Sequence, residues 1–242
     1  MKPVGYICDA CELLTVEILQ EIEKARKEYQ KVGVGIHSDA YFLQTYGRNP
    51  IKPFEEREKL IKALNGVDFT FVLNSEDDVF SDTISKSATL DDDFEVKKYH
   101  VGYAPGTYDL FHEGHLEHLM EVKSLCDILM VGVNSDDLVW KNKQKKTKLP
   151  EKDRINVVNN LKFVDYVYLV TTNQKSIAND WAKENIGCPI DVIFVGSDLK
   201  NQDFQNIENI PIIFTERDPV LMAKRSSSYY RNLLNKLQKK IN

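Results

Sequence analysis

The sequence predicts an α/β fold in which a parallel sheet is built twice, in two successive copies, and three observations lead to this prediction. Strand-like apolar segments alternate with helix-like segments, a pattern typical of parallel sheets covered by helices. The run ILMVGV at 128–133 is apolar throughout, as expected for a strand buried on both faces. Moving residues 4–73 by 97 places aligns them with residues 101–170 without a gap. Residues that coincide with identical ones include Val4, Gly5, Tyr6, Gly35, Ser38, Asp39, Pro53, Arg57, Val67 and Asp68.

The two copies differ in length. In each copy we expect the order strand, helix, strand, helix, strand. In the second copy we expect strands at 101–104, 128–133 and 164–170, with helices after residue 114 and at 151–162. Beyond these, the second copy continues with a helix near 174–186, strands at 191–197 and 211–216, and a final helix near 227–239. Right-handed connections between these strands place helices on both faces of the sheet.

The segment between the copies is polar and acidic and contains Asp91, Asp92 and Asp93. Such composition is typical of a linker between domains. We therefore expect a truncated domain at 1–80, a linker at 81–97 and a complete domain at 98–242.

Composition restricts the class of protein. The chain of 242 residues is 42% hydrophobic and 29% charged, with a net charge of −5 and a pI near 5.6. These values are typical of soluble globular proteins and disfavour a nucleic-acid partner. Apolar runs are too short to span a membrane, and the N-terminal residues lack the apolar stretch of a signal peptide. We expect a cytoplasmic protein with no membrane partner.

Two of the four cysteines, Cys8 and Cys11, form a C-x-x-C motif. Reduced thiols suit a cytoplasmic protein, and two small buried side chains after a strand are the simplest interpretation. A redox site or half of a zinc site is the alternative, although the sequence holds no second C-x-x-C to complete a four-cysteine zinc site.

A cluster of histidines follows the first strand of the second copy. His112 and His115 lie three residues apart where a helix is expected to begin, near Gly114. A helix start offers free N–H groups and a positive dipole end, so it suits a phosphate. The loop before it lies at the carboxyl end of a strand, where ligands of open parallel sheets bind. We expect His118, one turn further on, at the helix surface or in a groove.

Two further groups of polar residues favour an anionic ligand. Lys141, Lys143, Lys145 and Lys146 follow the second strand, and KRSSSYYR at 224–231 precedes and begins the last helix. Hydroxyl and N–H groups of Ser226 to Ser228 suit a helix cap and a phosphate. Arginines 217, 225 and 231 flank them. Together the three groups indicate a nucleoside triphosphate bound by loops, because the sequence has no P-loop motif.

The stretch GTYDLFHEGHLEHL resembles the H-x-G-H signature of the nucleotidyltransferase superfamily. Its context is most similar to the glycerol-3-phosphate cytidylyltransferases, through Gly106 to His115, Ser135-Asp136, Lys143 to Lys146, Arg154 and Val164-Asp165. The tandem layout is similar to ethanolamine-phosphate cytidylyltransferases. The resemblance implies a Rossmann-like nucleotidyltransferase fold, preceded here by a truncated, degenerate copy of the same fold.

The resemblance also implies an activity: the phosphate of a small acceptor attacks the α-phosphorus of CTP, and pyrophosphate leaves. It implies catalytic roles for His112, His115, Lys143 and Lys145. It implies nucleotide binding by Gly106, Thr107, Tyr108, Gly114, Gly196, Asp198, Arg225, Ser226, Ser227 and Ser228. It implies acceptor binding by Asp109, Lys146, Arg154, Asp165 and Arg217, with Asp109 either touching the ligand or fixing the loop. Mg²⁺ is expected on the nucleotide phosphates, without a protein metal site.

Several alternatives stay open at this point. The S-S-S-x-x-R form also resembles adenylyltransferases, so ATP is the alternative to CTP, and a non-catalytic nucleotide sensor is a second alternative. The acceptor is glycerol phosphate, phosphocholine, phosphoethanolamine or a sugar or polyol phosphate. Thr15 and Ile18 stand in the first copy where the second has His112 and His115. We expect the first copy to act as a pseudo-partner within the chain, or as a regulatory module, and a homodimer is a further expectation.

Overall fold

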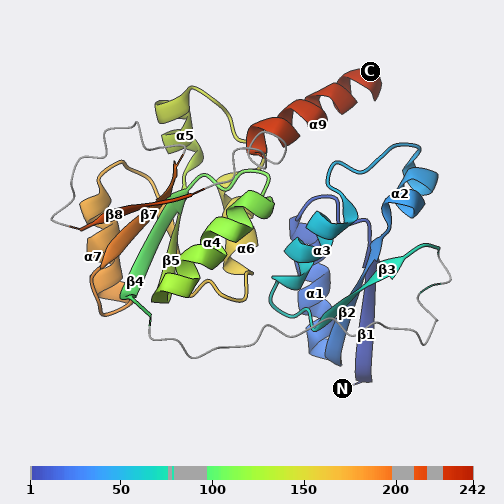
Figure 1. The fold of residues 1–242 in the computed structure, drawn as a ribbon, viewed down its shortest axis with the longest axis horizontal. Coiled ribbons are helices and arrows are strands. Elements are labelled where there is room, and N and C mark those ends of the chain that lie inside the picture. The colour runs from blue at the N-terminus through green and yellow to red at the C-terminus, as the bar shows by residue number, and fades with distance from the viewer. Residues whose placement is uncertain (1, 76–77, 79–96, 198–209, 217–225, 242) are drawn as a thin grey trace. The chain divides into compact units, whose positions relative to one another are not determined.

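The computed structural model describes residues 2–75, 78, 97–197, 210–216 and 226–241 and divides into two units (Figure 1). Unit 1 consists of residues 1–94, 160–162 and 232–242, and unit 2 of residues 95–159 and 163–231. Most of the linker expected at 81–97 lies outside the described residues.

Unit 1 contains a parallel three-stranded sheet of order β1-β2-β3. Its elements are β1 (Lys2–Asp9), α1 (Val16–Glu28), β2 (Tyr29–His37), α2 (Asp39–Tyr46), α3 (Phe54–Lys62) and β3 (Phe69–Leu73). The apolar residues of α1 recur at helical spacing, and Ile18 and Ile22 are buried. Val32, Val34 and Ile36 of β2 have no exposed surface, because α1 and α3 both contact this central strand.

Unit 2 contains a parallel five-stranded sheet of order β6-β5-β4-β7-β8. Its elements are β4 (Tyr99–Gly106), α4 (Glu113–Leu125), β5 (Cys126–Asn134), α5 (Asp136–Lys143), α6 (Glu151–Asn159), β6 (Tyr166–Val170), α7 (Lys175–Asn185), β7 (Val192–Gly196) and β8 (Ile212–Thr215). The last helix, α9 (Ser227–Ile241), is divided: residues 227–231 belong to unit 2 and the rest to unit 1. The chain builds outward from β4 through β5 to β6 and then crosses to β7 on the other side of β4. A crevice for a ligand is expected at this reversal, beyond the carboxyl ends of the strands.

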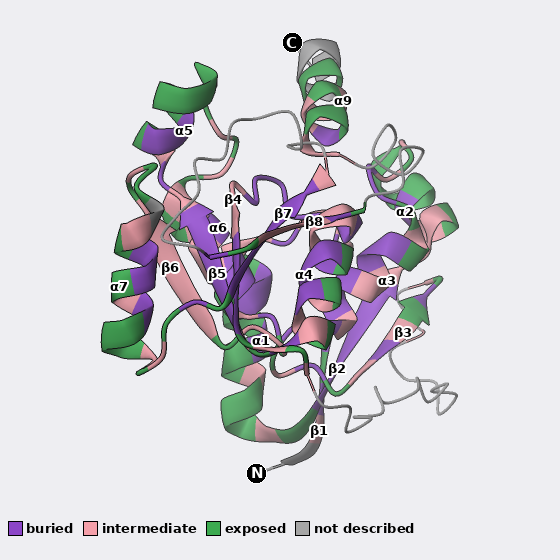
Figure 2. Ribbon diagram, turned by 60° about the vertical axis from the view of Figure 1, so that its left-hand side comes forward, coloured by how far each residue is buried: buried purple, intermediate pink, exposed green. Residues whose placement is uncertain are grey.

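Both faces of the sheet in unit 2 are covered. Helices α4 and α6 contact β4, β5 and β6. On the other face, Ala178 and Ala182 of α7 pack in one cluster with Tyr103, Met130 and other buried strand residues. Figure 2 shows the buried residues concentrated in the central strands. This arrangement explains why ILMVGV is apolar throughout and confirms an α/β fold with parallel sheets.

The short helices α2 and α5 were not expected. Each has eight residues and follows a serine, Ser38 or Ser135, whose Oγ accepts a hydrogen bond of 3.1 Å from the N–H three residues later. The serine therefore caps each helix in the usual way. Each helix is only about two turns long, too short to show a clear helical period, which is why the sequence did not indicate them.

The C-x-x-C motif lies at the end of β1. Cys8 is exposed and Cys11 is buried, and burial raises the pKa of both thiols. A raised pKa disfavours the thiolate that redox chemistry and zinc binding require. Among the described residues, no group of three His, Cys, Asp or Glu side chains could hold a metal ion.

In the part of the chain that the structure describes, no helix combines the length and the apolar character needed to cross a membrane.

Candidate functional site

The loop between β4 and α4 is held in an unusual backbone conformation. Tyr108 and Leu110 have φ angles of 54° and 51°, and Tyr108 donates from its hydroxyl to Ala104 O at 3.1 Å. The tyrosine ring packs back under the loop, where a Cβ at Gly106 would lie 2.7 Å from it. Gly106 is therefore required by this ring, and Tyr108, 3% exposed, supports the loop from below.

His112 and His115 stack at the start of α4. His112 is the N-cap residue in an extended conformation, and the two ring centroids lie 3.8 Å apart with an angle of 25° between the planes. A Cβ at Gly114 would lie 3.2 Å from the His112 ring, so glycine leaves room for this stacking. Two imidazoles therefore lie side by side at the positive end of a helix.

The first turn of α9 lies against this pair. Ser226 accepts a hydrogen bond from Tyr229 N at 3.3 Å and caps the helix. Ser227 Oγ lies 3.2 Å from His112 Nε2 and donates to Asp109 O at 2.8 Å. The predicted serine cluster and the predicted histidine pair, 115 residues apart, are thus brought together, with Ser228 exposed beside them.

The lysine run lies beside the same loop. Lys143, the last residue of α5, donates to Thr107 Oγ1 at 3.5 Å. Lys145 and Lys146 are exposed in the segment that follows. That segment is held in place further on, where Lys148 N and Leu149 N donate to the Asp109 carboxylate at 3.0 Å. Imidazoles, ammonium groups, hydroxyls and a helix start therefore meet at one loop, a donor set that suits a chain of phosphates.

Residues 103–232 match the model of a family described as cytidylyltransferase-like. The match extends over more than half of the chain and contains every group just described. The chain belongs to the cytidylyltransferase-like family.

Similar proteins include two that are called bifunctional protein HldE. The Helicobacter pylori (strain HPAG1) protein is 36% identical over 93 residues, which cover 37% of this chain and 20% of that protein. The Campylobacter concisus (strain 13826) protein is 31% identical over 117 residues, which cover 48% of this chain and 23% of that protein. The chain thus spans about a fifth of the length of the curated relatives it matches. A solved lipopolysaccharide core biosynthesis protein from Thermoplasma volcanium GSS1 is 27% identical with a TM-score of 0.39, covering 49% of this chain and 98% of that one.

In this cytidylyltransferase-like chain, Arg154 supports the site from within the fold. It was expected to contact the acceptor, but its guanidinium has no exposed surface and donates to Leu149 O, Thr107 O and Asp136 Oδ1. Burial raises the pKa of Asp136, but hydrogen bonds from Arg154 and Thr147 outweigh it and hold this pKa below its ordinary value. Arg154 thus holds the loop that carries Thr107, and its expected contact with the acceptor stays a prediction that this placement does not support.

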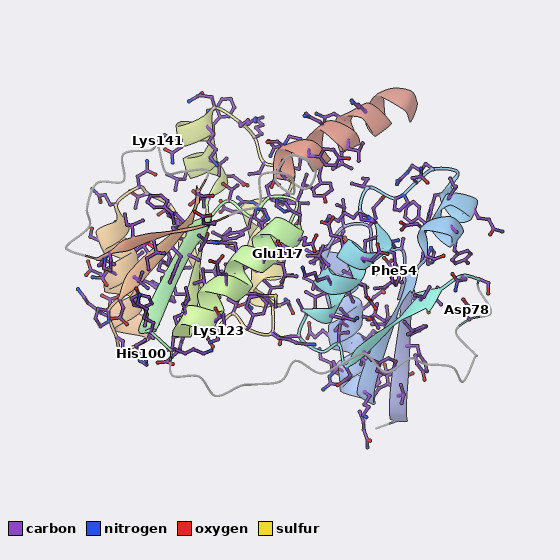
Figure 3. The ribbon with its side chains drawn as sticks, in the orientation of Figure 1. Phe54, Asp78, His100, Glu117, Lys123 and Lys141 are labelled. Carbon is purple, nitrogen blue, oxygen red and sulfur yellow. The ribbon has the colours of Figure 1, made fainter. Side chains whose placement is uncertain are left out.

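Asp165 lies at the wrong end of the sheet to meet the ligand. It precedes β6 and accepts from Leu129 N at 2.7 Å and Lys123 Nζ at 2.6 Å. Figure 3 shows Lys123 at the same end of unit 2 as His100, near the start of β4, and opposite the end that carries Lys141. Asp165 therefore joins the amino ends of neighbouring strands, and this placement does not support its expected contact with the acceptor, which stays a prediction.

Burial bears on two other expectations. Asp109 is 2% exposed and its carboxylate accepts from Lys148 N, Leu149 N and Arg231 Nη2, so it fixes the loop, the second of its two expected roles. His118 is 4% exposed and its Nδ1 lies 2.8 Å from Thr215 Oγ1, so it joins α4 to β8 inside the domain.

The remaining site predictions concern the late loops. Gly196 ends β7 and is buried. Asp198, Arg217 and Arg225 lie outside the described residues, so their roles stay predictions.

Two residues that the sequence analysis named without a role at the site hold it together. Arg231 contacts Asp109, and its signal was the spacing S-x-x-R, which places it one helical turn after Ser228. Asp136 binds Arg154, and its signal was the matching pair Asp39 and Arg57 in the first copy.

Proposed function

We propose that the chain is a nucleotidyltransferase that transfers CMP from CTP to a small phosphomonoester and releases pyrophosphate. The observation that carries this proposal is the stacked pair of His112 and His115 at the start of α4, with Ser227 at hydrogen-bonding distance from His112. The family to which the chain belongs supports transferase chemistry.

The reaction requires positioning and neutralisation of charge. A phosphate oxygen of the acceptor attacks the α-phosphorus of the nucleotide, the bond to the bridging oxygen breaks, and pyrophosphate leaves with the electron pair. Imidazole N–H groups of His112 and His115 donate to the phosphates, and Lys143 and Lys145 neutralise the charge that passes to the leaving group. Donors arranged in advance around developing charge are the main source of rate in such reactions.

Mg²⁺ is proposed as the cofactor, bound through the nucleotide phosphates. The protein groups beside the loop are imidazoles, ammonium groups and hydroxyls, and the nearby Asp109 carboxylate already accepts from three donors. Such a donor set fits an ion whose ligands are phosphate oxygens. When bound, Mg²⁺ would neutralise part of the triphosphate charge.

ATP is the second candidate for the nucleotide. The specific observation in its favour is the S-S-S-x-x-R arrangement, in which Ser227 and Arg231 both contact the loop of the H-x-G-H signature. This form of the last helix is similar to adenylyltransferases of the same superfamily.

The test is pyrophosphate release with Mg²⁺, in which CTP and ATP are crossed with glycerol phosphate, phosphocholine, phosphoethanolamine and sugar phosphates. Release with CTP and one acceptor is the expected result. Release with ATP alone would move the chain to the adenylyltransferases. Nucleotide binding without release from any pair would favour a sensor and contradict the enzyme.

We further propose that unit 1 is a truncated, degenerate copy of unit 2. Hydrogen bonds that recur at positions 97 residues apart support this. Arg57 donates to Ala10 O and Asp39 as Arg154 does to Thr107 O and Asp136, and Asp68 accepts from Val32 N as Asp165 does from Leu129 N. Both copies keep the groups that hold the loop, whereas Thr15 stands at the N-cap that His112 occupies in unit 2. Unit 1 is therefore expected to lack turnover of its own.

A further inference from the structure

The N-terminal turn of α9 contacts the loop before α4 at three points. Ser227 Oγ donates to Asp109 O at 2.8 Å, His112 Nε2 lies 3.2 Å from the same Oγ, and Arg231 Nη2 donates to Asp109 Oδ2 at 2.6 Å. One residue of the loop, Asp109, thus binds α9 through both its backbone and its side chain.

The Asp109 carboxylate is a junction of three segments. It is 2% exposed, and besides Arg231 it accepts from Lys148 N and Leu149 N at 3.0 Å. The Arg231 side chain is 18% exposed, so the ion pair lies largely out of water. Hydrogen bonds between charged groups in such surroundings are short and strong. The loop of the H-x-G-H signature, the end of the lysine run and the last helix are therefore held together at one carboxylate.

The contacts of Ser227 decide where the proton of His112 lies. A serine hydroxyl has one proton, and Asp109 O is a carbonyl that can only accept. Because Ser227 gives its proton to that carbonyl, its contact with His112 requires a proton on Nε2 of the imidazole. The other arrangement would place two oxygen lone pairs against each other at 2.8 Å. His112 therefore carries its proton on the ring edge that faces the start of α9.

Unit 1 offers an internal comparison. Glu12, 97 residues before Asp109, accepts from Ile51 N at 2.8 Å, as Asp109 does from Lys148 N. Its arginine is Arg48, which binds Glu12 through both Nη atoms at 2.6 and 2.7 Å and aligns with Lys145 of unit 2. In unit 2 the guanidinium comes instead from α9, and Lys145 is exposed beside the loop. Because the arginine that binds this carboxylate comes from α9 in unit 2, the ion pair attaches the last helix to the site.

We propose that Asp109 and Arg231 form a positioning pair that holds Ser227 against His112 and so keeps the donor proton of His112 on Nε2. A phosphate oxygen that reaches this edge would meet the imidazole N–H and the serine hydroxyls together. The effect on turnover rests on the proposed function, whereas the position of the proton does not.

The first experiment reads the tautomer of His112 in the full-length chain without any substrate. Long-range ¹H–¹⁵N NMR at about pH 8.5, where an ordinary imidazole is neutral, distinguishes Nε2–H from Nδ1–H. His112→Ala assigns the signal. We expect Nε2–H in the unaltered protein, a mixture of tautomers in Ser227→Ala and Arg231→Met, and Nε2–H again in Arg231→Lys. Arg48→Met, which breaks the corresponding pair in unit 1, is the control and should leave the His112 signal unchanged.

The second experiment measures turnover once a substrate pair is known. Because loss of alignment at a reacting centre costs up to about a hundredfold, we expect Arg231→Met to lower kcat/KM by about 10- to 100-fold, with part of it restored in Arg231→Lys. Asp109→Asn combined with Arg231→Met should cost little more than either alone, because the two act as one pair.

Two results would overturn the proposal: an Nδ1–H tautomer in the unaltered protein, or an unchanged tautomer in either Ser227→Ala or a folded Arg231→Met. A chain that releases no pyrophosphate would refute the proposed function alone, since the NMR experiment needs no activity. If Arg231→Met unfolds, Arg231→Gln, which removes the charge and keeps an amide donor, carries the test of the pair, while Ser227→Ala tests the serine contact separately.

Discussion

Arg154 and Asp136 form an ion pair of 2.6 Å in which the guanidinium has no exposed surface and the carboxylate side chain is 41% exposed. In unit 1, Arg57 and Asp39 form the corresponding ion pair at 2.7 Å, and their side chains are 0% and 46% exposed. This ion pair is present in unit 1, which has no counterparts of His112 and His115. It therefore belongs to the fold rather than to the ligand site.

Arg154→Met should therefore lower the free energy of unfolding, because Thr107 O and Leu149 O lose their donor and Asp136 loses its partner. We expect a loss of about 3 kcal/mol, as for acceptors inside the fold that are left without a donor, measured by urea unfolding. Arg57→Met is the matched variant and should also destabilise the chain. If Arg154→Met instead kept full stability and raised the KM for the acceptor, the result would favour a contact between Arg154 and the acceptor.

Lys52 predicts a dependence of stability on pH. Its side chain is fully buried, and burial lowers its pKa to about 8 against the opposing effects of Glu56 and Glu12. Between pH 8 and its ordinary pKa of 10.5, the unfolded chain holds a proton that the folded chain lacks, so the free energy of unfolding rises with pH in this window. The rise due to Lys52 should be about 3 kcal/mol at most.

The measurement is urea unfolding from pH 7 to pH 10.5 in the unaltered protein and in Lys52→Met. The difference between the two curves should grow with pH above about pH 8. Lys31→Met, which removes an exposed lysine of the same unit, is the control. Parallel curves for the unaltered protein and Lys52→Met would contradict the lowered pKa.

His112→Ala should reduce turnover by about 100-fold or more, as expected for the loss of one transition-state donor. Initial rates of pyrophosphate release would measure this. Thr15→Ala changes the corresponding N-cap of unit 1 and should leave the rate unchanged. A rate reduced equally by both changes would show that the effect is not specific to the site in unit 2.

Lys145→Met should raise the KM for the nucleotide about fivefold at low salt, because an exposed ammonium group attracts phosphate by roughly 1 kcal/mol. The increase in KM caused by Lys145→Met should become smaller as salt is added, since exposed charges are screened. Steady-state kinetics at two salt concentrations would measure both effects. Lys183→Met, on α7 and paired with Asp180, is the control. An increase in KM that does not depend on salt would instead indicate a structural role for Lys145.

The sequence by itself determined the strands, most of the helices, and the loop and helix start that carry His112 and His115. These features depend on neighbours along the chain: apolar periodicity, a glycine beside a ring, and a serine before a helix. It also indicated that Ser226 to Ser228 belong to the site. Such signals extend over a few residues, which is why they could be found without coordinates.

The tertiary structure alone decided which charged residues lie exposed beside the loop of the H-x-G-H signature and which support the fold. Arg154 and Asp165 looked like ligand contacts because they lie in the motifs, yet burial assigns the first to the loop and strand direction assigns the second to the far edge of the sheet. The pair of Asp109 and Arg231 joins residues 122 positions apart. Contacts between residues so distant arise only when the first turn of α9 meets the loop before α4 in the folded chain, so no local spacing encodes them.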